Sequence, residues 1–286
     1  MILEVLGSGG SIPTPKILCN CEACSEAREL GIQYYRLGPS VFIHGPNILI
    51  DTPEEISVQI NRAKIKNINT CLYSHWHPDH TAGRRVFEAG IDYKNIPPQN
   101  KATRIILTEM VAETFEKKMG LMEHFNFMES KGIIKKEIVM NDQKIKIDDC
   151  IVQPVQLAQS YVFGYIIKEK NKKILVIMDE LKDWNPSDKI LEEDFELVYL
   201  PFGLFDYNPI TNTQVMAKDH YLMKGENTIG ETLEIMKKLN AKQFILSHIE
   251  ESDSITRALA NKLEKHYSKV TGKTIRIAYD SMKIEV

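Results

Sequence analysis

Short runs of apolar residues recur along the chain and are separated by glycine, proline, asparagine or charged residues. Runs of this length that contain valine, isoleucine or tyrosine favour strands over helices. In the first half of the chain they predict strands at residues 2–6, 41–44, 47–51, 69–74 and 104–107. Because Gly45-Pro46 separates the second and third of these runs, we expect a hairpin there.

The second half of the chain repeats this pattern. Strands are expected at residues 132–138, 143–147, 151–157, 161–167, 174–178, 197–201, 243–247, 274–278 and 283–286, with a hairpin turn at 169–172. Helical spacing of apolar residues predicts helices at residues 54–64, 109–129 (one helix or two), 228–239 and 254–269. Two β-rich halves, each flanked by helices, indicate an α+β fold: a four-layer αββα sandwich of two sheets with helices outside.

The length of 286 residues suits one large domain or two closely packed halves. The sequence contains no internal repeat, no low-complexity segment and no clear linker. We therefore predict a single domain over residues 1–286. Its most irregular stretch, residues 202–224, is long for a loop and is predicted to be an insertion that forms a lid or a wall.

Composition and charge narrow the possible functions. Hydrophobic residues make up 43% and charged residues 26% of the chain, which is typical of a soluble globular protein. The net charge of −3 provides no overall basic field, so long nucleic acid is not an expected partner. The chain begins directly with a strand-like segment and has no run of about 20 apolar residues, so we expect neither a leader nor a membrane span. These features predict a cytoplasmic protein.

Three histidines and an aspartate follow the apolar run at 69–74. They are His75, His77, Asp79 and His80. This density of ligand side chains is typical of a metal site, and the alternative is a surface loop that happens to be rich in histidine. On extended backbone His75 and His77 point the same way toward one ion, whereas Asp79 and His80 can turn toward a second. We predict a two-metal site in which Asp79 is both a ligand and a catalytic residue.

This segment resembles the signature of the metallo-β-lactamase superfamily. The resemblance implies that fold and implies further ligands from distant parts of the chain. Asp179, directly after the run at 174–178, matches the aspartate that bridges the two ions. His248, directly after the run at 243–247, matches the last histidine, with a purely structural histidine as the alternative. Asp51 matches a buried aspartate that orients a ligand without binding the metal.

One expected histidine is missing. The matching position, just before the predicted strand at 161–167, holds Gln159. We count Gln159 among the metal ligands, but an amide oxygen binds zinc less well than an imidazole does. The ion held by His75 and His77 is therefore expected to be weak, replaced by another metal or absent. His124 is an alternative ligand, although a lone helix histidine usually has no such role.

Three of the five cysteines, Cys19, Cys21 and Cys24, are crowded into one short segment. Neighbours this close suit a metal better than disulfide pairing, and reduced thiols agree with a reducing compartment. Three thiolates are the right number for a structural zinc that awaits a fourth ligand. A chance cluster and a redox pair are the alternatives. We predict a zinc clip near residues 19–24.

The cysteine cluster, together with Arg36 and the segment 163–165, resembles the bacterial phosphodiesterases that open a phosphoribosyl cyclic phosphate in the carbon-phosphorus lyase pathway. In that family a histidine shortly after the last metal ligand completes the clip. The matching residue here is Glu251, which is our first choice for the fourth zinc ligand, with Asp253 and His220 as rivals.

His220 resembles the histidine that relatives place beside the leaving group, so we predict that it is a general acid. A loop histidine without a role is the alternative. Arg84 and Arg85 follow the histidine cluster, and one of them is a candidate to meet a substrate phosphate; either can equally be a solvated surface charge.

The resemblance implies a metal-dependent hydrolase that acts on a small, cyclic phosphodiester. Two divalent ions, zinc or manganese with iron as a further choice, would polarise the phosphoryl oxygens and activate a water. The first alternative is an iron-dependent oxidative enzyme, because the pyrroloquinoline quinone biosynthesis B protein is similar in fold and in its Cys-rich N-terminus. The second is a binding or sensor protein that has lost catalysis. Dimers are common among these relatives, so a homodimer is expected.

Overall fold

A computed structural model describes residues 1–92, 94–95 and 101–286. Most described strands belong to two large sheets. The first is a seven-stranded sheet with the order β18-β1-β2-β3-β4-β5-β6. Its strands are β1 (Ile2–Gly7), β2 (Ser40–His44), β3 (Ile48–Ile50), β4 (Thr70–Leu72), β5 (Thr103–Thr108), β6 (Ile134–Val139) and β18 (Met282–Glu285). The pairs β18-β1, β1-β2 and β2-β3 are antiparallel, whereas the pairs β3-β4, β4-β5 and β5-β6 are parallel.

The second sheet also has seven strands, in the order β17-β16-β12-β10-β9-β8-β7. They are β7 (Ile145–Ile147), β8 (Cys150–Gln156), β9 (Phe163–Glu169), β10 (Lys172–Val176), β12 (Leu197–Pro201), β16 (Phe244–Ser247) and β17 (Ile275–Ile277). Two short pairs stand apart, β11 (Asp194–Phe195) with β15 (Asn240–Ala241) and β13 (Tyr207–Asn208) with β14 (Thr213–Gln214). The hairpin predicted at 169–172 is confirmed, because β9 and β10 pair antiparallel across it.

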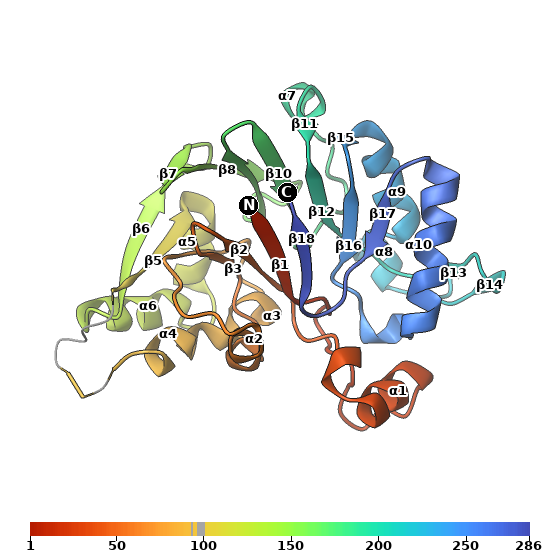
Figure 1. Ribbon diagram of the computed structural model, residues 1–286, viewed down its shortest axis with the longest axis horizontal. Helices are drawn as coiled ribbons and strands as arrows, with labels where there is room; N and C mark the ends of the chain where they lie inside the picture. The colour runs from red at the N-terminus through yellow and green to blue at the C-terminus, as the bar shows by residue number, and fades with distance from the viewer. Residues whose placement is uncertain (93, 96–100) are drawn as a thin grey trace.

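Helices cover the outer faces of both sheets, so the predicted αββα sandwich is confirmed (Figure 1). The helices of the first half lie beside the first sheet, and α9 and α10 lie beside the second. The α-helices are α1 (Glu22–Leu30), α2 (Ile56–Ala63), α3 (Pro78–Thr81), α4 (Val86–Ala89), α5 (Glu109–Lys117), α6 (Leu121–Ser130), α7 (Asp188–Leu191), α8 (Leu222–Gly225), α9 (Ile229–Lys238) and α10 (Arg257–Thr271). Short 3₁₀ helices lie between these elements, at Ile32–Tyr34, Ala82–Arg85 and Glu251–Asp253.

The central strands of the second sheet are buried on both faces. On β10, Ile174 and Val176 belong to the core between the two sheets, whereas Leu175 and its neighbour Ile177 pack with residues of α9 and α10. Strands β12 and β16 alternate in the same way. A strand buried on both faces reads as a continuous apolar run, which is why these strands were clear in the sequence.

Helix ends differ from the sequence prediction where the backbone becomes left-handed. The segment predicted as one or two helices at 109–129 is two, because Met119 (φ 53°) and Gly120 (φ 60°) break it. Helix α10 begins later than predicted, since Ser254 has φ 48° and Thr256 is the N-cap, accepting a hydrogen bond from Leu259 N at 3.2 Å. Capping of this kind fixes where a helix starts.

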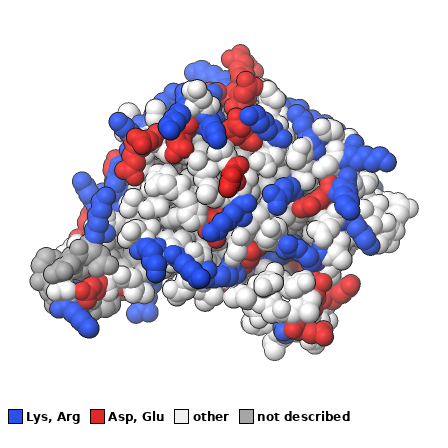
Figure 2. All heavy atoms as spheres, viewed as in Figure 1, with Lys and Arg blue, Asp and Glu red and all other residues white. Residues whose placement is uncertain are grey.

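The irregular stretch predicted at 202–224 contains the β13-β14 hairpin and the start of α8. Among the described residues, no helix is both long and apolar enough to span a bilayer. On the face seen in Figure 2, basic and acidic side chains are mixed, so this face carries no field of a single sign.

Candidate metal centre

The predicted metal-binding residues follow strands of both sheets at their carboxyl ends. Asp51 follows β3, His75 lies just beyond β4, Asp179 follows β10 and His248 follows β16. Strands β3 and β4 are parallel neighbours, and β10, β12 and β16 are parallel to one another, so their carboxyl ends meet at one edge of the sandwich. This edge holds two groups of candidate ligands, which we name the first and the second cluster.

The second cluster consists of Asp79, His80, Asp179 and His248, whose ligand atoms all lie within 4.8 Å of one another. The Nε2 atom of His80 is 3.2 Å from Asp79 Oδ2, and the Nε2 atom of His248 is 3.3 Å from Asp179 Oδ2. Two imidazoles and two carboxylates around a common point form a ligand set that suits a divalent metal ion. All four were predicted from the sequence as metal ligands.

Asp51 orients the ring of His80 through a contact on the side away from the second cluster. Its Oδ2 atom lies 2.7 Å from His80 Nδ1 and accepts a hydrogen bond from Ser74 Oγ at 2.6 Å, while Oδ1 accepts one from Ser74 N at 2.8 Å. Because Nδ1 of His80 is used in this way, Nε2 is the nitrogen that remains for a metal. Asp51 is completely buried, so its carboxylate depends on these partners.

The first cluster contains one residue that the sequence did not predict. It consists of His75, His77, Asp179 and Glu180, again with ligand atoms within 4.8 Å of one another. The Nδ1 atom of His77 is 3.3 Å from Glu180 Oε1. Glu180 therefore offers a carboxylate to the first cluster, and Asp179 is common to both clusters.

Gln159 lies behind Glu180. Its Nε2 atom donates to Glu180 Oε2, and its Oε1 atom accepts from the hydroxyl of Tyr161. The amide predicted as a ligand thus contacts the carboxylate of the first cluster and holds it in place. The signal for Glu180 in the sequence was only its position next to Asp179, which does not show where the side chain points.

The residues present fit a pair of metal ions. The Nε2 atoms of His75, His80 and His248 are buried and make no hydrogen bond. A buried nitrogen without a partner is costly, and three such atoms on histidines of the two clusters are the expected arrangement of metal ligands. Burial also holds the pKa of His75 well below its usual value, which keeps this ring in the neutral form that binds metal.

The crowded charges of the clusters shift the pKa values of their members. Burial opposes a charge on His248, but the carboxylates of Asp179 and Asp79 raise its pKa to about 9. Burial, aided by the charges of Asp179 and Glu226, raises the pKa of Glu180 to about 7. So many carboxylates at one place repel one another unless a cation, either a proton or a metal, lies between them.

Three residues of the centre have left-handed backbone conformations although none is glycine: Asp51 (φ 63°), Glu180 (φ 59°) and His248 (φ 53°). Such conformations cost about 1 kcal/mol or more and persist where the surrounding structure imposes them, often at functional sites. Each of the three follows a strand, so the turn of the backbone directs its side chain into the centre.

A third cluster lies at the cysteine segment, where all three thiols face the same carboxylate oxygen. The Oε1 atom of Glu251 is 2.9 Å from Cys19 Sγ, 3.3 Å from Cys21 Sγ and 3.2 Å from Cys24 Sγ. These four residues form a group that can hold a metal. The sequence predicted the same set, with Glu251 as fourth ligand. It did not predict α1, whose N-cap is the unusual residue Cys21.

The cysteine cluster and the second cluster are joined through two consecutive glutamates. Glu250 accepts hydrogen bonds from Ser11 N (2.9 Å) and Ser11 Oγ (3.1 Å) and lies 3.6 Å from Nδ1 of His248. Glu251 belongs to the cysteine cluster. A Cβ atom at Gly10 would lie 2.1 Å from Glu250 Oε1, so a larger residue there would displace the Glu250 side chain from its place beside His248. The loop that carries His248 is thus fixed by the contacts of Glu250 with Ser11 and by those of Glu251 with the three cysteines.

Two further predicted residues lie outside the clusters. The Nδ1 atom of His220 accepts a hydrogen bond from Leu222 N at 3.3 Å, within its own loop. Asp253 is buried and accepts a hydrogen bond from Phe205 N at 3.2 Å, which anchors the insertion instead of the clip. Neither belongs to any of the metal-ligand groups found among the described residues.

The remaining candidates also have local partners. His124 pairs with Glu88, which lies 3.5 Å from Arg85 as well. Arg84 donates to the carbonyl of Thr81 at 3.4 Å, and the side chain of Arg85 is 80% exposed. Arg85 is therefore a surface charge. Because His124 pairs with Glu88 and belongs to neither cluster, it does not take the place of the missing histidine.

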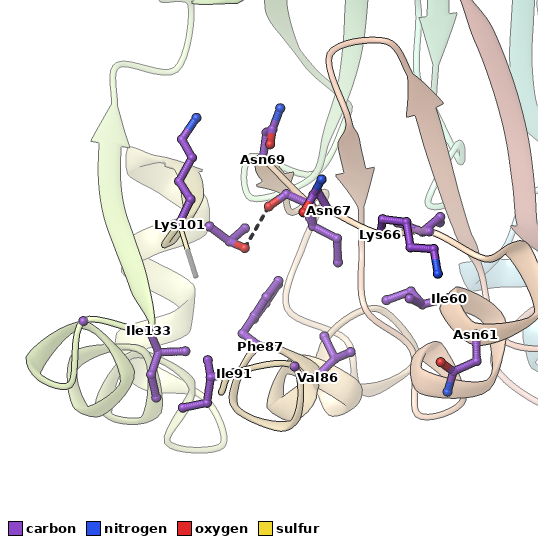
Figure 3. A pocket seen from close by; sticks show the side chains of 15 residues that line it. Ile60, Asn61, Lys66, Asn67, Asn69, Val86, Phe87, Ile91, Lys101 and Ile133 are labelled. Atoms are coloured by element: carbon purple, nitrogen blue, oxygen red, sulfur yellow. Dashed lines mark hydrogen bonds between the residues drawn. The ribbon is translucent and has the colours of Figure 1, made fainter. Parts of the chain in front are cut away.

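A cavity of about 490 Å³ lies elsewhere, near the amino ends of β4 and β5. Figure 3 shows apolar side chains such as Ile60, Phe87 and Ile133 around it, with Lys66 and Lys101 at the same site. None of the described residues that line it is a histidine, a cysteine or an acidic residue. We therefore place the chemistry at the metal centre.

Residues 46–249 match the family model described as the β-lactamase superfamily domain. This region includes β3 to β16 and both clusters of the centre. The chain belongs to the β-lactamase superfamily. Together with the αββα sandwich, this membership confirms the metallo-β-lactamase fold predicted from the histidine segment and supports a metal-dependent hydrolase. No curated protein sequence matches the chain.

Solved structures with this fold match the whole chain at low identity. A diphosphatase of the PhnP family is 21% identical, covers 100% of this chain and 97% of its own, and has a TM-score of 0.72. Zinc-bound PqqB from Methylobacterium extorquens is 12% identical with 100% of both chains covered and a TM-score of 0.70. The short form of human tRNase Z is 14% identical, covers 100% and 99%, and has a TM-score of 0.65. These likenesses concern the fold.

Replacing Gln159 with leucine is expected to weaken binding of the ion in the first cluster by roughly 10- to 100-fold, because the support of Glu180 is lost. Competition with a chromophoric chelator measures this affinity. The matched control is Gln156→Leu, because Gln156 is exposed and its side chain donates to Ser160 O, away from both clusters. Gln159→His, which offers an imidazole instead, should tighten zinc binding. Equal affinities in all three variants and the wild type would show that residue 159 does not act on the metal.

Proposed function

We propose that this member of the β-lactamase superfamily is a metal-dependent phosphodiesterase that acts on small phosphodiesters, cyclic ones included. The observation that carries the proposal is the pair of clusters that share Asp179. Two divalent ions bound there would supply a Lewis acid for the phosphoryl oxygens and a water whose pKa is near neutrality. Such a ligand arrangement suits the hydrolysis of a stable diester.

The residues of the chain have separate tasks in this proposal. His75, His77 and Glu180 hold one side of the centre, and Asp79, His80 and His248 hold the other. His220 remains our candidate for protonating the leaving alkoxide; it lies just before Glu226, which interacts electrostatically with the second cluster. Cys19, Cys21, Cys24 and Glu251 are proposed to bind a structural zinc, a set of soft and carboxylate ligands that suits this ion.

The similar structures support a hydrolase of phosphate bonds. The PhnP-family structure is described as a diphosphatase, and tRNase Z acts on RNA. We favour a small substrate because the net charge of −3 gives no general attraction for a polyanion.

The test is hydrolysis of bis-p-nitrophenyl phosphate by protein loaded with zinc or manganese. We expect turnover that rises with metal content until both clusters are filled and that is lost on treatment with a chelator such as dipicolinic acid. Restoring the metal should restore activity. Protein that holds two equivalents at the centre and hydrolyses neither this diester nor a cyclic phosphodiester would contradict the proposal.

Glu180 favours one alternative, an iron-dependent oxidative enzyme. Two histidines with a carboxylate are the ligand set of many non-haem iron oxygenases, and the fold is shared with PqqB. Iron in the first cluster together with substrate-dependent oxygen consumption would support this alternative. Zinc or manganese in the purified protein without oxygen consumption would reject it.

A further inference from the structure

A groove lies between the 3₁₀ helix at Ile32–Tyr34, the start of α10 and the turn before β18. It consists of two adjoining cavities, of about 270 Å³ and about 10 Å³, and the described residues that line both are Gln33, Tyr34, Arg257 and Tyr279. We name it the arginine groove. Its described lining includes no residue of the three metal-ligand clusters, so it is separate from the metal centre and from the clip.

Three guanidinium groups and two carboxylates belong to the described lining of the arginine groove. They are Arg36, Arg62, Arg257, Glu26 and Asp280. Asp280 is buried, and it already accepts hydrogen bonds from four donors: Ser8 N, Ser8 Oγ, Leu37 N and Arg62 Nη2. Over the described part of the chain, its ion pair is with Arg62, at 3.1 Å. Asp280 therefore serves as the counterion of Arg62 and leaves the other two guanidinium groups without one.

Arg36 is a buried cation that forms no ion pair with any described residue. Only 6% of its surface is exposed. Its Nη1 atom donates to two neutral oxygens, Ser8 Oγ at 3.2 Å and Ala278 O at 2.7 Å. A buried charge without a counterion is costly, and burial lowers the pKa of Arg36 to about 10 although the charge of Asp280 opposes this shift. An anion in the groove would reduce this cost.

Arg257 is the second guanidinium group without a carboxylate partner. Its backbone N–H donates to Glu26 Oε2 at 3.2 Å, whereas its side chain makes no ion pair or hydrogen bond within the described parts of the chain. The Cζ atom of Arg257 lies 3.9 Å from the ring centroid of Tyr279. This contact with an aromatic face holds the half-buried guanidinium group at the groove while its N–H donors remain unused.

We propose that the arginine groove binds a small organic oxyanion, that is, a phosphate or carboxylate group attached to an apolar or aromatic part. Three guanidinium groups face two carboxylates, so one negative charge of a ligand balances the groove. The planar guanidinium fork matches the oxygens of phosphate and carboxylate groups. The larger cavity, with Ile32, Tyr34 and Tyr279 in its lining, has room for the attached part. This second site does not depend on the phosphodiesterase function proposed above.

Calorimetric titration of metal-loaded protein with phenylphosphonate, benzoate and neutral benzamide tests the proposal. We expect the anions to bind in the groove and benzamide to bind at least about tenfold more weakly. Arg257→Gln should weaken anion binding there by about tenfold or more, because it removes a charge-assisted donor. The control Lys262→Gln removes one positive charge from the exposed side of the same helix and should keep the affinity of the wild type. The Tm without ligand shows that each variant is folded.

Two further variants separate the groove from the metal centre and from effects on folding. A phosphonate also binds metal ions, so the titrations are repeated in Asp179→Asn, which should keep the groove's affinity for both anions. Gln33 is exposed and lines both cavities, so Gln33→Glu adds a repelling charge without disturbing the core and should weaken anion binding by a similar factor.

The outcomes of these titrations are distinct. Binding of the phosphonate alone would assign the groove to phosphorylated ligands, and binding of benzoate alone would assign it to carboxylates. Binding that disappears in Asp179→Asn would place the anions at the metal centre and overturn the proposal. Absence of binding for both anions, or equal affinities in the wild type, Arg257→Gln and Gln33→Glu, would overturn it as well. Benzamide that binds as tightly as benzoate would overturn the role of the charge.

Discussion

Replacing Asp179 with asparagine is expected to lower kcat/KM for diester hydrolysis by roughly 10³-fold or more, the largest loss for any single substitution at the centre. Asp179 belongs to both clusters and lies 3.3 Å from His248 Nε2. Its loss therefore removes a charged ligand from each ion at once. A neutral amide cannot balance two divalent ions as a carboxylate does, so metal content at the centre should fall together with activity.

The control for Asp179→Asn is the same change at Asp183, an exposed residue of the same loop with φ 59°. Asparagine tolerates this left-handed conformation, so Asp183→Asn should retain wild-type metal content and activity. Circular dichroism should show that both variants are folded. Full metal content and activity in Asp179→Asn would show that this aspartate does not bridge the ions.

The second large effect is expected from Cys24→Ser. Cys24 is completely buried and its thiol lies 3.2 Å from Glu251 Oε1. Without a metal, burial raises the pKa of this thiol to about 12, so the thiolate needed for zinc depends on the metal itself. Loss of this ligand should release one zinc and lower the free energy of unfolding by about 3 kcal/mol. That corresponds to a fall in Tm of roughly 6–12 °C in a thermal melt.

The same substitution should weaken the metal centre at a distance, because Glu251 and Glu250 are adjacent and Glu250 lies beside His248. We expect hydrolysis to fall by roughly 10- to 100-fold, as for the loss of support behind a ligand. Cys150→Ser is the control, since this buried cysteine lies outside the clip. Retention of all zinc in Cys24→Ser, or an equal loss of Tm in Cys150→Ser, would count against a structural metal at the clip.

The sequence predicted the strands, and the ligands at their ends, where an apolar run is followed directly by a metal-binding residue type. Strands buried on both faces appear as apolar runs, and a ligand placed directly after such a run must lie at a strand end. Asp179 and His248 were predicted as ligands on this basis, together with the resemblance to the superfamily. Because β10, β12 and β16 are parallel, their carboxyl ends lie along the same edge of the sheet. Residues that are distant in the sequence therefore lie close together at that edge.

Glu180 could not be found in this way. It stands next to Asp179, and on an ordinary extended backbone neighbouring side chains point to opposite sides. Its left-handed backbone and its hydrogen bond from Gln159 place the Glu180 carboxylate in the same cluster as that of Asp179. The backbone conformation and the hydrogen bond both depend on the folded structure around them. The sequence shows only that residue 159 is not the histidine that the resemblance implied, whereas the carboxylate beside it is visible only in three dimensions.

The central claim of this account is that Glu180, with His75, His77 and Asp179, binds the first of two ions at the centre. Metal analysis of protein saturated with zinc and freed of excess metal tests it most directly. We predict three zinc ions per chain in the wild type, one of them at the clip, and two in Glu180→Ala, with the Tm of the variant showing that the fold persists. Two zinc ions in both proteins, or three in both, would contradict the claim.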